Sequence, residues 1–313
     1  MSELLRRYGY GLSSLFIGLT AFWLLVLVIL PDLYLFENSF RPYIPTAEIG
    51  GPTDFYSLNN YLAFFKGPDW HKFTVFPGLP DFQVFASIHE VVFVETIIFS
   101  SIVTVLCFLI SYPIAYYLAK VANPRVVPTL FLVLLIPLWV SEILRCFALF
   151  IILSLKGPLN LSLMGLGIIH DPIRWISNFN SITIGFIYVY ILFMLFPVYN
   201  AIQSLDSNQI EAAQDLGAPW WRTHWRVILP HSKPGIASGC VMVFMLSAGS
   251  LFVPSLLGST NSRWFTEIIQ QWFFESQDWN TGAAYAFLLL LLCIIFVSLM
   301  MRVFRVSLAD IAK

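Results

Sequence analysis

The sequence predicts an all-α fold, a polytopic membrane bundle of about six transmembrane helices. Two features of composition point to this class: 58% of the residues are hydrophobic and only 11% are charged, whereas a soluble domain is about half apolar and about a quarter charged. The mean hydropathy of +0.78 agrees with them. Such hydrophobicity excludes a disordered chain, and a net charge of −1 excludes the basic surface of a nucleic-acid-binding protein.

Six stretches are apolar enough to cross the bilayer, which takes about 20 helical residues. They cover residues 12–36, 93–119, 126–153, 182–204, 235–257 and 282–303. The first follows Arg6 and Arg7, as in a secretory signal, but it is too long and lacks a small-residue cleavage site. We therefore expect it to be retained as the first transmembrane helix.

The distribution of Lys and Arg predicts how the helices face. Ten of the 17 basic residues lie at Arg302 or in residues 1–11, 120–125, 205–234 and 304–313. The longer segments on the other side, 37–92, 154–181 and 258–281, hold six. Because Lys and Arg concentrate in cytoplasmic loops, we expect a multi-pass protein with both termini in the cytoplasm.

These assignments divide the chain into four parts. Residues 1–36 form the cytoplasmic N-terminus and first helix, and residues 37–92 form an extracytoplasmic insertion, structured because it is rich in aromatic residues. Residues 93–304 form the core, with a cytoplasmic loop at 205–235, and residues 305–313 form a cytoplasmic tail.

Prolines and cysteines lie inside the apolar stretches. Proline kinks a helix by removing a hydrogen bond, and membrane proteins tolerate this where neighbours satisfy the freed carbonyl, either around a pathway or in plain packing. The prolines are Pro113, Pro137, Pro197 and Pro254. The cysteines, far apart in the sequence, are expected to be small buried apolar side chains; they are Cys107, Cys146, Cys240 and Cys293.

The motifs of several catalytic classes are missing from the sequence. None of the six lysines is followed by Ser or Thr, as a phosphate-binding loop requires. The five histidines contain no HExxH pair, and no GxSxG nucleophile elbow occurs. We expect no catalytic residues, no metal site and no enzyme activity on this chain.

The longest cytoplasmic loop, residues 206–236, begins with a helix-forming stretch from Gln209 to Leu216. Ser207 or Asn208 can cap its N-terminus, and Gly217 can end it. Acidic side chains near the N-terminus would interact favourably with the helix dipole. On composition alone, the tryptophans and arginines that follow could instead form an amphipathic hairpin on the membrane surface; they are Trp220, Trp221, Arg222, Trp225 and Arg226.

This loop resembles the EAA loop of ABC-importer permeases, in which EAA is followed at fixed spacing by Gly, Ile and Leu-Pro. The matching residues are Glu211, Ala212, Ala213, Gly217, Val227, Leu229 and Pro230, and Val for Ile is the one departure. The resemblance covers roughly residues 95–300, including IPLWVSEILRCFALFIIL from Ile136, KGPLN, FVPSLLG and DWNTGAAYAFLLLL, which are similar to polyamine-type permeases. Importers of opines, phosphonates and ferric iron share the pattern.

The resemblance implies a type I ABC importer permease-like fold in the bacterial inner (plasma) membrane. The chain would form half of the path for a small organic solute, a polyamine or related amine. The resemblance also implies three protein partners: an ATP-binding subunit dimer, a second homologous permease subunit and an extracytoplasmic substrate-binding protein. ATP and Mg would bind the ATPase, and this chain would carry no cofactor. Membrane lipid would surround this chain, and no nucleic acid would bind to it. The residues expected to couple it to the ATPase are Glu211, Ala212, Ala213, Asp215, Gly217, Leu229 and Pro230.

The translocation path has fewer sequence markers. Glu142 and Arg145 share a helix face at membrane depth, where charges usually face a cavity or a polar partner. Glu142 could attract a cationic solute, with Trp139 and Tyr190 as aromatic neighbours and Ser250 also on the path. Alternatively, Glu142 and Arg145 form a structural pair near the interface.

The substrate is the least determined property. Polyamine permeases often carry acidic residues where this chain has Ser250 and Ser255, which leaves a less cationic or zwitterionic solute open. An ion-coupled secondary transporter is the alternative function; it predicts inverted repeats and buried carboxylates, and neither is evident in the sequence. A membrane-embedded enzyme is disfavoured by the missing catalytic motifs.

Overall fold

The protein is described by a computed structural model covering residues 2–44, 48, 51–52, 54–66, 70–74, 83–176, 179–258 and 262–306. Within these residues, five helices are long and apolar enough to cross a membrane. A sixth span results if two helices that are bent by 72° at Ser232 count as one. The predicted all-α membrane bundle is therefore confirmed. The predicted tail, 305–313, lies outside the described residues beyond Val306.

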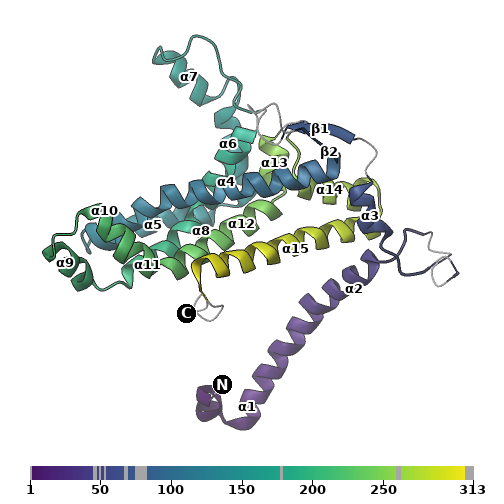
Figure 1. Ribbon diagram of the computed structural model, residues 1–313, viewed down its shortest axis with the longest axis horizontal. Helices are drawn as coiled ribbons and strands as arrows, with labels where there is room; N and C mark the ends of the chain where they lie inside the picture. The colour runs from purple at the N-terminus through teal and green to yellow at the C-terminus, as the bar shows by residue number, and fades with distance from the viewer. Residues whose placement is uncertain are drawn as a thin grey trace.

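The bundle core consists of α4 (Ile88–Tyr116), α8 (Phe179–Gln203) and α12 (Lys233–Gly249), which run side by side, with α15 (Trp279–Phe304) along α12 (Figure 1). Buried apolar side chains such as Val103, Phe186 and Val243 fill the space between them. A Cβ at Gly239 would contact Met194, so this glycine permits a close approach of α12 to α8.

The first span lies at the side of this bundle. It is a continuous helix formed by α1 (Ser2–Leu24), the π-helical turn η1 (Leu25–Ile29) and α2 (Leu30–Ser39). Only α2 packs on α15, where Phe36 meets Phe287 at a ring distance of 5.2 Å. Much of α1 projects away from the other helices (Figure 1), leaving Leu15 66% exposed.

The predicted third span, 126–153, is not one helix. It consists of α5 (Val127–Trp139) and α6 (Glu142–Leu153), separated by an extended backbone at Val140 and Ser141. Pro137 lies two residues before the end of α5 and donates no backbone hydrogen bond, which favours ending the helix there. In Figure 1, α6 turns away from the bundle and leads to α7 (Pro158–Gly165).

The predicted fifth span is also broken. Ser250 is extended between α12 and α13 (Phe252–Leu257). Because Pro254 has no N–H for the Ser250 carbonyl four residues earlier, that oxygen is free, and the Thr266 hydroxyl donates to it at 2.6 Å. The prolines of α4 and α8, Pro113 and Pro197, instead lie inside continuous helices.

Short elements cover the two ends of the bundle. At one end lie α9 (Ser207–Asp215), α10 (Trp220–Thr223), the π-helical turn η4 (His224–Ile228) and α11 (Leu229–His231), next to the π-helical turn η3 (Tyr117–Val121) of α4. At the other end lie α3 (Asn59–Phe65), β1 (Trp70–Thr74), β2 (Gln83–Ser87), α14 (Phe265–Gln270) and the π-helical turn η5 (Gln271–Glu275). We call these the α9 end and the α3 end.

The insertion between the first two spans contains an antiparallel hairpin that the sequence analysis did not predict. Strands β1 and β2 pair from Trp70 opposite Ser87 to Thr74 opposite Gln83. Ser87 then starts α4 with a capping box. The Ser87 hydroxyl accepts a hydrogen bond from the backbone N–H of Glu90, and the Glu90 carboxylate accepts one from the backbone N–H of Ser87. In its described residues this insertion forms α3 and the hairpin.

Candidate functional site

The helix predicted to couple the chain to a partner forms at the α9 end. It runs from Ser207 to Asp215, close to the predicted range. The predicted N-cap is wrong: Asp206 caps the helix, and its carboxylate accepts a hydrogen bond from the backbone of Asn208 at 3.0 Å. The predicted acidic first turn is wrong too, because Glu211 lies in the middle of the helix, so the cap alone places negative charge at the N-terminus.

Gly217 ends α9 as predicted. Its φ of +75° is in the left-handed region, which glycine adopts at little cost. The Gly217 N–H bonds to the Gln214 carbonyl at 2.8 Å and the Ala218 N–H to the Ala213 carbonyl at 3.0 Å, the two bonds of a Schellman motif. The chain thus reverses sharply after Leu216.

One side of α9 holds it to the bundle and the other faces outward. Ile210 is buried in the core cluster, whereas Glu211, Ala212 and Asp215 are exposed and Ala213 is half-buried. Leu216 is 89% exposed. An apolar side chain held this far out at the tip of a helix is a suitable anchor for another protein.

Of the remaining loop positions, Pro230 is exposed and Leu229 is half-buried against the core, both in α11. The rings of Trp220, Trp221 and Trp225 are largely exposed. Exposed rings are compatible with the membrane-surface hairpin as well as with a protein partner, so they do not decide between these interpretations.

The predicted path residues come together only in part. Glu142 begins α6, and its Oε1 accepts hydrogen bonds from the hydroxyl of Tyr190 on α8 at 2.7 Å and from that of Ser250 at 3.4 Å. The carboxylate therefore joins the break between α5 and α6 to the break between α12 and α13. Trp139 does not join this cluster, because it is 89% exposed.

Arg145 does not pair with Glu142. Arg145 is 7% exposed, and its guanidinium donates to the Val189 carbonyl of α8 at 2.9 Å. Within the described residues, both ion pairs belong to Arg41, which contacts Glu37 and Asp54 at the α3 end. The structural pair of Glu142 and Arg145 is thus not observed. Arg145 instead donates to a backbone carbonyl of α8, and Glu142 accepts from Tyr190 and Ser250.

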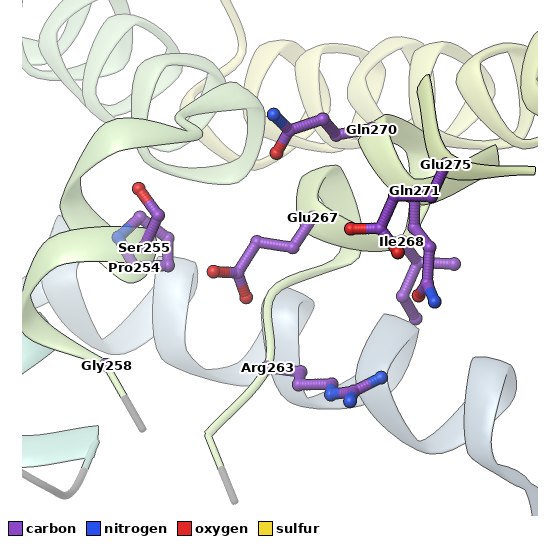
Figure 2. Close-up of a pocket in the computed structure, with 9 residues that line it drawn as sticks. All are labelled: Pro254, Ser255, Gly258, Arg263, Glu267, Ile268, Gln270, Gln271 and Glu275. Atoms are coloured by element: carbon purple, nitrogen blue, oxygen red, sulfur yellow. The ribbon is translucent and has the colours of Figure 1, made fainter. Parts of the chain in front are cut away.

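A polar pocket of about 430 Å³ lies between α13 and α14 at the α3 end. Figure 2 shows Glu267 reaching from α14 toward Ser255 of α13, with Glu275 on the far side of the pocket. The Glu267 carboxylate also accepts the backbone N–H of Trp264 at 2.8 Å. Burial raises the pKa of Glu267, and the Trp264 bond and Arg263 partly oppose this shift.

The sequence analysis missed Glu267 and Glu275 as candidate site residues. A local signal existed for Glu267, since an acidic residue three positions into a short helix is typical of a helix start. Nothing local indicates that α13 would close a pocket against it, because that contact is tertiary.

Comparison with known proteins assigns this architecture to a family. Residues 108–306 match the family model described as "Binding-protein-dependent transport system inner membrane component". The spermidine/putrescine transport system permease protein PotB of Escherichia coli is 31% identical over 262 residues, which cover 84% of this chain and 86% of that protein. PotB of Haemophilus influenzae is 36% identical over 185 residues, covering 59% of this chain and 64% of that protein.

A solved structure shares the fold. The bacterial alginate ABC transporter in complex with an alginate pentasaccharide-bound periplasmic protein contains a chain with a TM-score of 0.66, at 16% identity, covering 95% of this chain and 96% of its own. At this identity the likeness concerns the fold alone.

This chain belongs to the family of inner-membrane components of binding-protein-dependent transport systems. It is a transmembrane permease subunit of an ATP-binding-cassette importer. It is not an enzyme, because ATP is hydrolysed by a separate subunit in such importers. The ion-coupled secondary transporter finds no support in these comparisons.

Proposed function

We propose that this permease subunit forms half of the import path for a small organic amine, a polyamine or a related compound. The observation that carries the proposal is the Glu142 carboxylate, which is presented at two adjoining helix breaks by Tyr190 and Ser250. Its other oxygen, Oε2, makes no hydrogen bond in the described part of the chain. That oxygen is available to an ammonium group, which binds carboxylates by charge-assisted hydrogen bonds.

Ser250 and Ser255, which stand where polyamine permeases often have acidic residues, each have carboxylates nearby. Glu142 of α6 lies against Ser250, and the pocket lined by Ser255 also contains Glu267 and Glu275. Carboxylates from other elements thus supply the charge that α12 and α13 lack. The PotB relatives are permeases of spermidine/putrescine transport systems, and this likeness also supports an amine as the cargo.

Arg145 limits how many positive charges the site accepts. Its buried guanidinium lies one helical turn from Glu142 and has no carboxylate partner among the residues that the structure describes. We call the cluster of Glu142, Tyr190 and Ser250 the inner site. The Glu142 carboxylate and the Arg145 guanidinium lie on the same helix face, so together they leave this site with little net charge. We therefore propose that the inner site contacts one ammonium group at a time and that Tyr190 lines it; Trp139 stays a weaker candidate because it faces outward.

We propose that α9 is the coupling helix, with Glu211, Ala212, Ala213, Asp215 and Gly217 at the contact with the ATPase. Leu216 adds an apolar anchor to that surface. The predicted partners are an ATP-binding subunit dimer that carries ATP and Mg, a second homologous permease and an extracytoplasmic binding protein. Closure of the ATPase dimer would shift the permease between inward- and outward-facing states.

We also propose the orientation and the four predicted segments for this chain. The basic residues of the loop, among them Arg222 and Arg226, lie at the α9 end, so the positive-inside rule places that end and both termini in the cytoplasm. The α3 end, with the insertion 37–92, then faces the binding protein.

The test is uptake by proteoliposomes that contain this chain together with the ATPase, the second permease and the binding protein with which it co-purifies. We expect ATP-dependent accumulation of labelled putrescine or spermidine and none of an anionic sugar of similar size. A ligand screen on the binding protein identifies the preferred amine. Uptake of anions in preference to amines would refute the proposed cargo, and uptake driven by an ion gradient without the ATPase would refute the importer mechanism.

A further inference from the structure

A polar contact joins the loop that follows α9 to the second span. The Tyr112 hydroxyl of α4 and Nδ1 of His224 in η4 share a hydrogen bond of 2.8 Å, although the residues are 112 positions apart in sequence. The His224 ring packs between the rings of Tyr116 and Trp220, at centroid distances of 4.5 and 5.5 Å. His224 therefore has both a directional and a packing contact with its surroundings.

This contact lies on the inward side of the segment. Thr223 is 3% exposed and Ile228 is fully buried, whereas Trp225 on the outer side is 70% exposed. The Schellman turn at Gly217 connects the segment directly to α9, with only Ala218 and Pro219 between the turn and α10. A displacement of α9 would therefore reach His224 within a few residues.

The same part of α4 also holds the start of the loop. Lys120, in the π-helical turn η3, donates to the carbonyl of Leu205 and to that of Gln203 at 3.5 Å, at the C-terminal end of α8. An ammonium group is favourable at a helix C-terminus because carbonyls there lack helical partners. The chain is thus held on both sides of α9, before it by Lys120 of η3 and after it by Tyr112 of α4.

Both contacts involve π-helical turns, η3 in α4 and η4 in the loop. Such turns interrupt the regular hydrogen-bond ladder and are frequent at functional sites. From this point α4 continues along α8 and α12 toward the α3 end. A force applied at α9 can therefore enter the bundle at Tyr112.

We propose that Tyr112 and His224 are positioning residues that transmit the displacement of α9 to α4 during transport. The inference rests on the proposed role of α9 as the coupling helix. It assigns to α4 a part in coupling that the EAA-like residues alone do not indicate. The hydrogen bond between Tyr112 and His224 carries the displacement to α4, and the ring contacts with Tyr116 and Trp220 hold His224 in place.

Two matched comparisons test the hydrogen bond. Tyr112→Phe removes one hydroxyl, and Tyr117→Phe is its control because Tyr117 is exposed and makes no hydrogen bond in the described structure. His224→Asn keeps a polar atom at the position of Nδ1, whereas His224→Leu has nearly the same shape without it. Each variant is first checked for co-purification with the ATPase, and then measured for cargo moved per ATP hydrolysed in proteoliposomes with loaded binding protein.

We expect Tyr112→Phe and His224→Leu to keep ATP hydrolysis but to lower the cargo moved per ATP about fivefold, which corresponds to the net value of one hydrogen bond, about 1 kcal/mol. Tyr117→Phe and His224→Asn should stay within twofold of wild type. The double variant should be no worse than either single variant, because the residues act through one bond. If His224→Leu fails to assemble, Tyr112→Phe decides alone.

The outcomes separate this inference from the proposed function. If the wild-type complex couples cargo to ATP and Tyr112→Phe matches it, the tether is wrong while the coupling role of α9 stands. If Glu211→Lys, on the exposed surface of α9, moves as much cargo per ATP as the wild type, the coupling role of α9 is wrong and the tether with it.

Discussion

Glu142 is a carboxylate at membrane depth whose free-energy cost is offset by its contacts at the helix breaks. A carboxylate at membrane depth costs about 2.5 to 3.5 kcal/mol to insert, whereas a hydrogen bond to a charged group returns about 1.5 to 3 kcal/mol. The bond from Tyr190, the weaker one from Ser250 and the N-terminal position in α6 together offset most of that cost. The carboxylate can therefore remain available to cargo.

Replacing this carboxylate should weaken cargo binding without disturbing assembly. For Glu142→Gln we expect the KM for amine uptake to rise about tenfold, which is about 1.4 kcal/mol, because the amide keeps the shape but loses the charge. Uptake kinetics in proteoliposomes measure this. Asp32→Asn, which removes an exposed carboxylate from α2, is the control. An unaltered KM for Glu142→Gln would assign Glu142 a purely structural role.

The backbone of Gly217 supports a second residue-scale prediction. A Cβ at this position would touch nothing within 4 Å, so only the left-handed φ opposes substitution. We expect Gly217→Ala to destabilise the end of α9 by about 1 kcal/mol, and Gly217→Asn by less, because Asn tolerates this conformation. Amide hydrogen exchange of residues 207–218 measures the difference. Equal protection in the two variants would contradict it.

At the scale of elements, α9 is a short helix that is held at the surface with most of its side chains exposed. Its helix is only nine residues long, which is too short to be stable alone in water. The Asp206 cap, the Schellman turn and buried Ile210 therefore fix it from both ends and from one side. What remains exposed is a small, acidic surface with Leu216 at its tip.

Reversing the charge of that surface should uncouple the transporter. We expect Glu211→Lys to insert and fold normally, because Glu211 is exposed, and to reduce cargo uptake at least tenfold while basal ATP hydrolysis continues. Uptake and phosphate release measured in the same vesicles check this. Asp32→Lys, which reverses the charge of an exposed side chain on α2, is the control. Glu37 is not used for this purpose because it pairs with Arg41. Normal uptake by Glu211→Lys would refute the coupling surface.

The packing of α8 against α12 gives another prediction at this scale. A Cβ at Gly235 would collide with the Pro197 carbonyl and with the Ala201 side chain, whereas a Cβ at Gly249 of the same helix meets nothing within 4 Å. We expect Gly235→Ala to cost about 1 to 3 kcal/mol and Gly249→Ala to be neutral. Thermal unfolding in detergent compares them. A Gly235→Ala protein as stable as the Gly249→Ala protein would contradict this close approach.

At the scale of the whole molecule, the two ends of the bundle carry different structures. The α9 end holds short helices with exposed tryptophans, and the α3 end holds the hairpin and the polar pocket (Figures 1 and 2). All four cysteines are buried, as expected from the sequence. The bundle therefore offers a low background for labelling introduced cysteines.

Labelling can establish the orientation. With a membrane-impermeant maleimide on intact spheroplasts, we expect Phe55→Cys to react and Ser207→Cys to react only after lysis. Both positions are exposed, but Phe55 lies four residues before α3 and Ser207 begins α9 at the opposite end. Reaction of both variants in lysed membranes is the control for accessibility. The reverse pattern in intact cells would place the α9 end outside and overturn the predicted topology.

The sequence determined the class of the protein and the local chemistry of its loop. Hydropathy is summed along the chain, so composition alone identified the membrane bundle, and the motif from Glu211 to Pro230 identified the family that the comparisons confirm. Gly217 ended α9 as predicted because a left-handed turn depends on one residue. The N-cap was misassigned because Asp206, Ser207 and Asn208 are all able to cap a helix.

Tertiary structure decided the contacts across the helix breaks. Pro137 favours a helix end within the apolar run 126–153. Only the tertiary structure shows that Glu142, just after the break, meets Tyr190 and Ser250 from distant segments. The Tyr112–His224 bond and the pocket at Glu267 likewise join segments far apart in sequence. Such contacts depend on the directions of packed helices, which no local pattern encodes.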